Sequence, residues 1–140
     1  MKTISWKVCL EASPSEVFSL LSTDEGRKSF WAEKAQEKDG AIHFEFPNGW
    51  SYSGKILKSI PDQEFHLDYF ESLVRFQLEP NAEGGTDLLL INEGVPDHDY
   101  LEVYAGWVSV LMNLKAVVDH HADLRNHNSE KTWDQGYVNN

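Results

Sequence analysis

Alternating apolar and polar residues open the chain, with the period of a β-strand that buries one face. The apolar positions are Ile4, Trp6, Val8 and Leu10. The next residues, Ser13-Pro14-Ser15-Glu16, place a hydroxyl at a helix N-cap, proline at the first helical position and glutamate three residues after the cap. They predict a short helix. Ser22 and Glu25 repeat the capping spacing and predict a second short helix that carries Phe30 and Trp31.

Short strands separated by turn residues follow from Ala41 to Glu93. The turn signals are Asp39-Gly40, Pro47-Asn48-Gly49, Pro61-Asp62 and Gly84-Gly85. Closely spaced strands of this kind predict an antiparallel meander. The strand from Thr86 to Asn92 is apolar at four successive positions, so its pattern leaves the register open.

The turn at Pro47-Asn48-Gly49 can be specified further, because its length decides which side chains share a face. A three-residue loop, with a type I turn and a left-handed Gly49 at a bulge, sets Phe46 opposite Trp50. Phe44 then faces Tyr52, and all four aromatic side chains lie on one face of the hairpin. A two-residue loop would split them between the two faces.

The segment from Glu64 to Glu79 is predicted to form a second hairpin. One face carries Phe65, Leu67, Tyr69, Val74, Phe76 and Leu78. On the other face the expected register sets Asp68 opposite Arg75 and His66 opposite Gln77. This polar face is expected to be the solvated outer face of the sheet.

A helical period begins after Gly94-Val95-Pro96 and predicts a long helix from about Asp99 to about Asp123. Its apolar stripe is Tyr104, Trp107, Val108, Leu111, Leu114 and Val118. The only large apolar surface available to bury this stripe is the concave face of the sheet. The pattern therefore predicts an α+β fold, in which a curved antiparallel sheet wraps around a long C-terminal helix and two short helices follow the first strand.

Composition narrows the class of partner. The 140 residues fit one domain, and the single cysteine cannot form an internal disulfide. The net charge of −11 repels phosphate backbones and anionic lipid surfaces, so neither nucleic acid nor a membrane is an expected partner. The chain shows no signal-peptide layout at Met1-Lys2-Thr3-Ile4, and the expected location is the cytoplasm.

Several short sequence motifs, which occur in the same order as in that family, resemble the activator of heat shock protein 90 ATPase homologue-like family. This family belongs to the START-like (SRPBCC) superfamily, which includes pollen allergens and polyketide cyclases. These motifs are Ala12-Ser13-Pro14-Ser15-Glu16-Val17-Phe18, Phe30-Trp31-Ala32, Tyr52-Ser53-Gly54-Lys55-Ile56-Leu57, Val74-Arg75-Phe76-Gln77-Leu78-Glu79-Pro80, Gly84-Gly85-Thr86 and Gly106-Trp107. The resemblance implies a helix-grip domain over residues 1–125. The tail at 126–140, with Trp133 and Tyr137, has no family counterpart and is expected to dock onto the body or onto a neighbouring subunit of a homodimer.

The helix-grip resemblance also implies a gap between sheet and helix that can hold an apolar ligand. The residues expected to bound it are Trp31, Phe44, Phe46, Trp50, Tyr52, Tyr69, Phe76, Trp107 and Leu111. The alternative is that these side chains fill a solid core, because apolar periodicity is the same for a core and for a cavity wall. We expect non-catalytic binding of a small apolar or aromatic, lipid-like ligand.

Two other functions stay open. An enzyme of polyketide cyclase or hydrolase type would need an ionisable group inside the cavity, with Glu93, Asp68, His66 and Arg75 as the residues to check. A protein-interaction module resembling the co-chaperone domain would present an apolar patch on its outer sheet face. The co-chaperone's separate N-terminal domain has no counterpart here, so we do not expect this chain to stimulate an ATPase on its own.

No metal site, cofactor or catalytic residue is predicted. His120 and His121 with Asp119 and Asp123 form the densest polar group, but adjacent helical residues point about 100° apart and fit a polar helix end better than a metal site. Asp97-His98-Asp99 is expected at the start of the long helix. Cys9 lies on the polar face of the first strand and has no assigned histidine partner, so we expect it to be chemically unreactive.

Overall fold

A single antiparallel sheet forms the base of the molecule in the computed structural model, which describes residues 1–140. Its seven strands lie in the order β1-β7-β6-β5-β4-β3-β2. Their bounds are β1 Lys2–Leu10, β2 Lys34–Lys38, β3 Ala41–Glu45, β4 Ser51–Ile60, β5 Glu64–Tyr69, β6 Ser72–Pro80 and β7 Thr86–Val95. The helices are α1 Pro14–Ser22, α2 Asp24–Phe30 and α3 Tyr100–His120, with short 3-10 turns η1 Asp97–Asp99 and η2 Trp133–Gln135.

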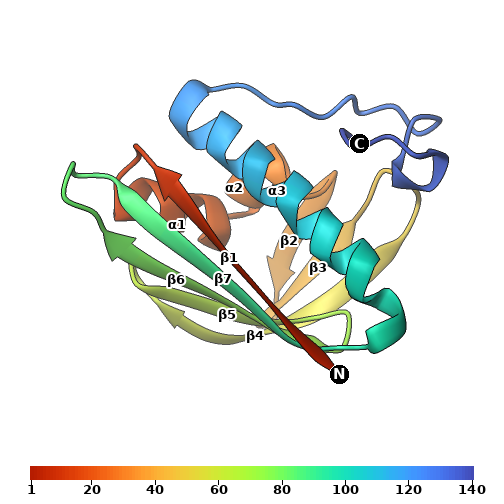
Figure 1. Ribbon diagram of the computed structural model, residues 1–140, viewed down its shortest axis with the longest axis horizontal. Coiled ribbons are helices and arrows are strands. Elements are labelled where there is room, and N and C mark those ends of the chain that lie inside the picture. The colour runs from red at the N-terminus through yellow and green to blue at the C-terminus, as the bar shows by residue number, and fades with distance from the viewer.

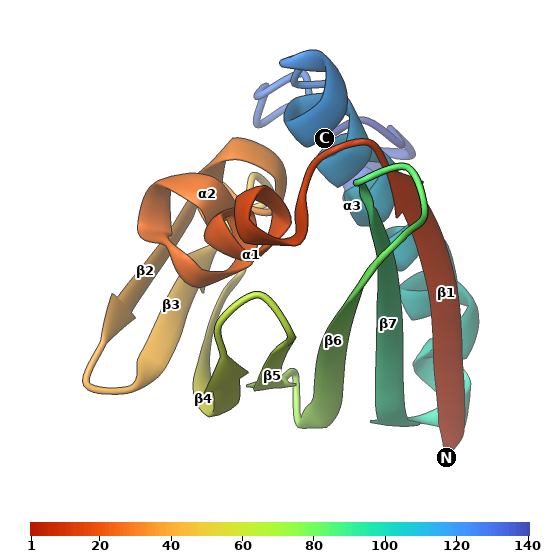
Figure 2. The same cartoon turned by 90° about the vertical axis from the view of Figure 1, so that its left-hand side faces the viewer.

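The sheet curves, and the helices lie on its concave side. Figure 1 shows α3 crossing above the sheet, and Figure 2 shows α1 and α2 between the two arms of the curve. The predicted α+β helix-grip fold is confirmed, with a long C-terminal helix and two short helices after the first strand.

The two short helices begin at hydrogen-bonded caps. Ser13 and Glu16 form the predicted capping box of α1, with Pro14 in its first turn. The predicted cap of α2 is wrong by one residue, because Thr23 rather than Ser22 accepts from the backbone N–H of Gly26 (3.0 Å). Ser22 is instead the last residue of α1, so the two helices share a single connecting residue.

The hairpin between β3 and β4 has the predicted geometry. Phe44 pairs with Tyr52, Phe46 N–H donates to the carbonyl of Trp50 (2.8 Å), and Gly49 has a φ of 87°. A left-handed glycine closes a three-residue loop in this way. The four aromatic residues of this hairpin therefore lie on one face.

The predicted register of the β5–β6 hairpin is wrong by two residues. His66 pairs with Arg75 and Asp68 with Leu73. The reason is a two-residue turn at Phe70 and Glu71, both of which have positive φ (49° and 61°). Turns of this type favour Asn-Gly, so the sequence Phe-Glu gives no signal for one. A shift of two residues keeps every side chain on its predicted face.

Helix α3 runs from Tyr100 to His120, inside the predicted span. Trp107, Leu111 and Leu114 of the predicted stripe are buried, whereas Val108 is 40% exposed and its inclusion is wrong. Asn113 and Ala116 are buried instead. By length and composition the segment Asp97–His120 could cross a membrane, but here the buried stripe of the helix belongs to the core of the fold.

The chain ends in a segment that we call the C-terminal strap, residues 121–140. It leaves α3 at His121, a left-handed C-cap, and runs back along the helix toward the β3–β4 turn (Figure 1). Ser109 Oγ donates to the carbonyl of Val138 (2.7 Å), and Asn48 Nδ2 donates to Asp134 (3.2 Å). The strap therefore docks on the body of its own chain.

Candidate ligand-binding cavity

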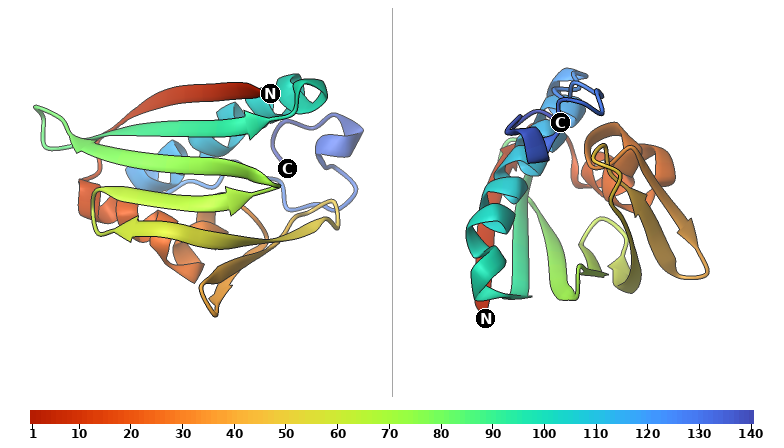
Figure 3. Two further views of the ribbon diagram at one scale, coloured as in Figure 1. Left: turned by 90° about the horizontal axis from the view of Figure 1, so that it is seen from below. Right: turned by 90° about the vertical axis from the view of Figure 1, so that its right-hand side faces the viewer.

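A cavity of about 950 Å³ lies between α3, the concave face of the sheet and the C-terminal strap. The right-hand view of Figure 3 shows the arrangement, with α3 on one side, β2 and β3 on the other and the strap above. The volume is at the upper end of the ~300 to 1,000 Å³ that is typical of small-molecule sites. The curvature of the sheet provides this space, because β3 and β4 turn away from α3.

Aromatic side chains form the inner wall of the cavity. The ring centroids of Trp31, Tyr69 and Trp107 lie 5.4, 5.5 and 5.9 Å apart. Phe46 and Phe70 extend this wall toward the β3–β4 and β5–β6 turns, 5.8 Å from each other. All five tryptophans of the chain are among the lining residues. Such a wall offers apolar contact area and aromatic stacking to a ligand.

The structure brings five of the nine predicted ligand-binding residues to the cavity, namely Trp31, Phe46, Trp50, Tyr69 and Trp107. Trp50 is the most exposed of these, at 58%. Binding by these five residues stays a prediction.

The other four predicted residues are not in the lining. Phe44, Phe76 and Leu111 are buried in the core behind it, at 1, 0 and 3% exposure. Tyr52 lies beyond Tyr69 and donates a hydrogen bond from its hydroxyl to Asp68 (2.9 Å). Apolar periodicity identified the concave face but could not separate residues that touch the cavity from those directly behind them.

Other lining residues were absent from the predicted set. They are found on the first strand at Trp6, on the β5–β6 turn at Phe70, on α3 at Val103 and Val110, and on the strap at Leu124 and Val138. The alternation in β1 predicts that Trp6 lies on the buried face of this strand, so this signal could have identified it. Phe70 depended on the turn that the sequence did not reveal, and the strap has no periodicity to interpret.

Two hydrogen-bonded chains satisfy polar groups within the aromatic wall. Trp31 Nε1 donates to the hydroxyl of Tyr69 (3.2 Å). Trp107 Nε1 donates to Oδ1 of the buried Asn92 (2.9 Å), whose amide donates in turn to Ser72 Oγ (2.8 Å). Because both indole N–H groups have partners, the orientations of the two rings are fixed.

The charged residues of the lining are Asp99, Glu102, Arg125 and Asp134. Glu102 on α3 accepts from Trp133 Nε1 (3.1 Å), and Asp134 accepts from Asn48. These bonds connect the strap to α3 and to the β3–β4 turn. The lining contains no histidine, cysteine or lysine.

The residues to check for acid or base catalysis lie elsewhere. Asp68, His66, Arg75 and Glu93 are outside the cavity lining, and Arg75 forms an ion pair with Glu93 across β6 and β7. Burial lowers the pKa of His66. The predicted cross-strand partners of His66, Asp68 and Arg75 are wrong, but these three side chains keep their predicted place on the outer face of the sheet.

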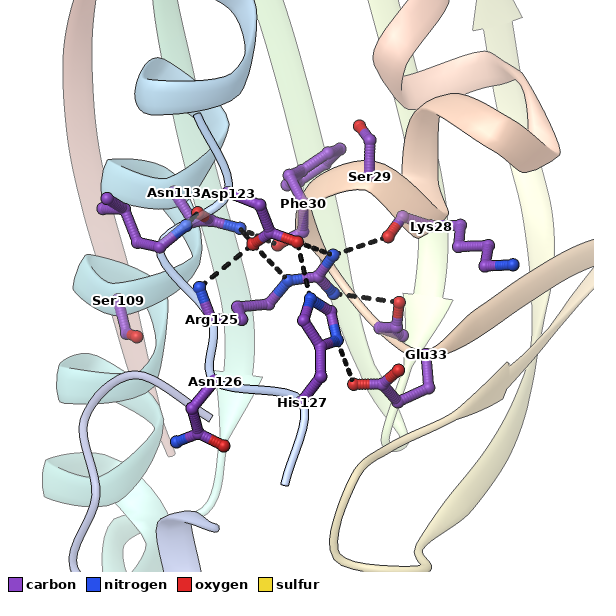
Figure 4. A network of polar contacts seen from close by, with 12 residues as sticks. Lys28, Ser29, Phe30, Glu33, Ser109, Asn113, Asp123, Arg125, Asn126 and His127 are labelled. Carbon is purple, nitrogen blue, oxygen red and sulfur yellow. Dashed lines mark hydrogen bonds and ion pairs between the residues drawn. The ribbon is translucent and has the colours of Figure 1, made fainter. Parts of the chain in front are cut away.

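A cluster of charged residues anchors the start of the strap (Figure 4). Arg125 donates to Asp123 (3.0 Å) and to the backbone carbonyls of Lys28 (2.7 Å) and Ala32 (3.0 Å). His127 bonds Asp123 (2.6 Å) through Nε2 and Glu33 (2.8 Å) through Nδ1. We call Glu33, Asp123, Arg125 and His127 the anchor cluster; it connects α2 and the start of β2 to the strap.

Charge and hydrogen bonding shift the pKa values of this cluster. Burial opposes ionisation of Asp123, but hydrogen bonds from Arg125 and His127 outweigh it and lower its pKa well below the usual range. The hydrogen bond to Asp123 raises the pKa of His127, and Glu33 adds to the shift. The cluster is therefore strongest when His127 is protonated.

The residues considered for a metal site serve other purposes in the fold. Asp119 accepts from Lys115 (2.8 Å) and from the backbone N–H groups of Glu11 and Ala12 (3.0 Å each). His120 and His121 are exposed at the end of α3, and Asp123 belongs to the anchor cluster. No group of three or more His, Cys, Asp or Glu side chains in residues 1–140 is arranged to hold a metal ion.

Comparison with known proteins supports the fold. The sequence model of a family described as activator of Hsp90 ATPase homolog 1-like protein matches residues 11–119. The strap lies outside this match. No curated protein sequence matches the chain.

Three similar solved structures illustrate the extent of the likeness. Protein SSP2350 from Staphylococcus saprophyticus is 20% identical with a TM-score of 0.75, covering 86% of this chain and 94% of its own. The structure described as the Aha1 dimer from Colwellia psychrerythraea is 23% identical with a TM-score of 0.73, covering 86% and 98%. Protein CV1439 from Chromobacterium violaceum is 25% identical with a TM-score of 0.70, covering 85% and 99%.

Proposed function

The chain belongs to the activator of Hsp90 ATPase homolog 1-like family, and from this premise we propose that it binds a small apolar or aromatic ligand in the cavity without catalysis. The observation that carries the proposal is the cavity of about 950 Å³ with its wall of Trp31, Phe46, Tyr69, Phe70 and Trp107. A space of this volume could accommodate a lipid-like or polycyclic molecule. Burial of the ligand's apolar surface would supply most of the binding free energy.

The residue types in the cavity lining favour non-catalytic ligand binding over enzymatic catalysis. A cyclase or hydrolase needs a group that can transfer a proton near neutral pH at the reacting atom. The acidic side chains of the lining are Asp99, Glu102 and Asp134. Glu102 and Asp134 accept hydrogen bonds that hold the strap in place. We therefore keep the enzyme as the second candidate.

The outer sheet face gives little support to a protein-interaction module. It carries ion pairs such as Lys58 with Glu64 and Arg75 with Glu93, and the exposed Leu57 is its most prominent apolar side chain. An interface usually needs a contiguous apolar centre.

Partners and location complete the proposal. A homodimer is proposed because the similar Colwellia psychrerythraea protein is described as a dimer. We propose that neither nucleic acid nor a membrane is a partner, because the net charge of −11 repels phosphate groups and anionic lipids. We also propose a cytoplasmic location.

The test is a titration with N-phenyl-1-naphthylamine, a neutral fluorescent probe, followed by probe emission and by tryptophan quenching. Saturable binding of one probe per chain would support the proposal, because the tryptophans all line the cavity. Absence of binding to the folded protein would contradict it. Native mass spectrometry of protein purified from its own host would then search for a retained small molecule.

The variant Gly106→Phe tests whether the probe binds in the cavity. Gly106 lines the cavity, and a Cβ atom built there meets no atom within 4 Å. The added ring is expected to occupy ligand space and weaken probe binding by about tenfold, or about 1.4 kcal/mol. Unchanged binding in a folded variant would locate the probe elsewhere.

A further inference from the structure

The cavity wall contains a tyrosine hydroxyl that lies among aromatic rings and whose hydrogen has no acceptor. Tyr69 Oη accepts a hydrogen bond from Trp31 Nε1 (3.2 Å), and it appears in no other hydrogen bond of the structure. The Tyr69 ring is enclosed by Trp31, Phe44 and Trp107, with centroids 5.4 to 5.5 Å away. Both Tyr69 and Trp31 line the cavity, so this bond lies within its aromatic wall.

A donor left without an acceptor in an apolar wall costs free energy, and such groups in native proteins call for an explanation. The neighbouring polar groups do not supply the acceptor. Asn92 is bonded to Trp107, Ser72 and the carbonyl of Leu73, while Ser72 Oγ donates to the Tyr69 backbone carbonyl. Within the group formed by Trp31, Tyr69, Ser72, Asn92 and Trp107, the Tyr69 hydroxyl is therefore the one side-chain donor without an acceptor.

The hydroxyl is suited to donate rather than to ionise. Burial raises the pKa of Tyr69 far above its ordinary value, and the bond from Trp31 only partly offsets this. The group therefore keeps its hydrogen at any physiological pH. Because Trp31 already donates to the oxygen, polarisation along the chain strengthens the donation by the hydroxyl.

From this geometry we propose that Tyr69 is the polar anchor of the cavity, and that the ligand is an uncharged apolar or aromatic molecule with a hydrogen-bond acceptor such as a ketone oxygen. The inference rests on the proposed binding function and adds the chemistry of the ligand. Apolar surface would supply affinity, and the single hydrogen bond would orient the molecule against the aromatic wall.

The buried indole Nε1 of Trp6 also belongs to the lining and has no hydrogen-bond partner. It belongs to a separate group, since the nearest aromatic partner of Trp6 is Tyr104, at 4.9 Å, which packs in turn against Tyr100. Tyr137 provides the control. It is a tyrosine outside the cavity lining, and 41% of its surface is exposed.

The experiment compares two planar probes of the same shape, 2-acetylnaphthalene and 2-isopropenylnaphthalene, which differ in whether a carbonyl oxygen is present. Affinities are measured by displacement of N-phenyl-1-naphthylamine from wild type, Tyr69→Phe and Tyr137→Phe. We expect Tyr69→Phe to weaken acetylnaphthalene about threefold to tenfold, the range for one net hydrogen bond. We expect Tyr69→Phe to leave the affinity for isopropenylnaphthalene unchanged, and Tyr137→Phe to leave the affinities for both probes unchanged.

A vibrational signature identifies the bond directly. With a ¹³C-labelled carbonyl, the stretch of bound acetylnaphthalene should move to lower wavenumber in wild type and return in Tyr69→Phe. Equal affinities in all three proteins, with no carbonyl shift, would overturn the anchor while leaving apolar binding intact. Failure of the wild type to bind isopropenylnaphthalene would instead contradict the proposed function itself.

Discussion

The effect of Gly106→Ala on the free energy of unfolding tests whether the space beside α3 is empty. Gly106 lies within α3 and lines the cavity, and a Cβ atom added there meets nothing within 4 Å. In a helix interior, alanine is favoured over glycine by about 1 kcal/mol because the unfolded chain loses less entropy on folding. In a solid core, by contrast, the extra methyl group would displace its neighbours.

The expected result is therefore a stabilisation of about 1 kcal/mol. For a chain of this length, that corresponds to a rise in Tm of about 3 °C, taking an unfolding entropy of roughly 2.1 cal/mol/K per residue. Chemical denaturation and differential scanning calorimetry measure both quantities on the same sample.

The chain provides a control with the opposite sign. Gly26 lies within α2, and a Cβ atom there would approach Leu20 Cα to 2.5 Å and Ser19 O to 2.6 Å. Gly26→Ala should therefore destabilise the protein by roughly 1 to 3 kcal/mol. If Gly106→Ala also lowers stability, the space beside α3 is filled and the cavity geometry is wrong.

The remaining predictions concern the strap and one buried charge. Because the pKa of His127 is raised in the folded state, its contribution to stability is complete below its unfolded pKa and is lost as pH rises through the folded value. His127→Gln should therefore cost more stability at about pH 5.5 than at about pH 8.5, and equal losses at both would contradict the account. Removal of residues 126–140 should lower Tm and speed probe release in stopped-flow measurements, since Thr132 is buried and the strap lines the cavity; unchanged Tm and release would refute this. Arg27→Ala should destabilise the protein by roughly 3 kcal/mol, because the fully buried guanidinium donates to the carbonyls of Leu21 and Ala35. A loss of less than about 1 kcal/mol, measured by urea denaturation, would refute this prediction.

Much of the fold could be predicted because local chemistry and the global pattern agree. The capping box at Ser13 and Glu16 starts α1, and the parity argument at Pro47–Gly49 identifies which aromatics share a face. The helical period after Pro96 identifies α3. Each of these patterns involves residues close together in the sequence, so one sequence is sufficient to predict the element.

The errors arose where tertiary contacts decide the structure. Phe70 and Glu71 adopt positive φ without glycine or asparagine, although Tyr52 supports the turn by accepting from the Glu71 N–H (3.0 Å). The periodicity of α3 could not show that Leu111 packs in the core while Gly106, five residues earlier, lines the cavity. The strap is positioned by Arg125 through carbonyl groups more than 90 residues distant in sequence, which leaves no local pattern.

Binding of a small apolar molecule against the aromatic wall is most directly tested by NMR of the five tryptophan indole N–H groups during titration with N-phenyl-1-naphthylamine. Each indole reports on a different part of the lining, and Trp31 and Trp107 report on the inner wall. We predict that these two signals shift together and saturate at one probe per chain. Saturation of the probe with no shift of either signal would contradict binding in the cavity.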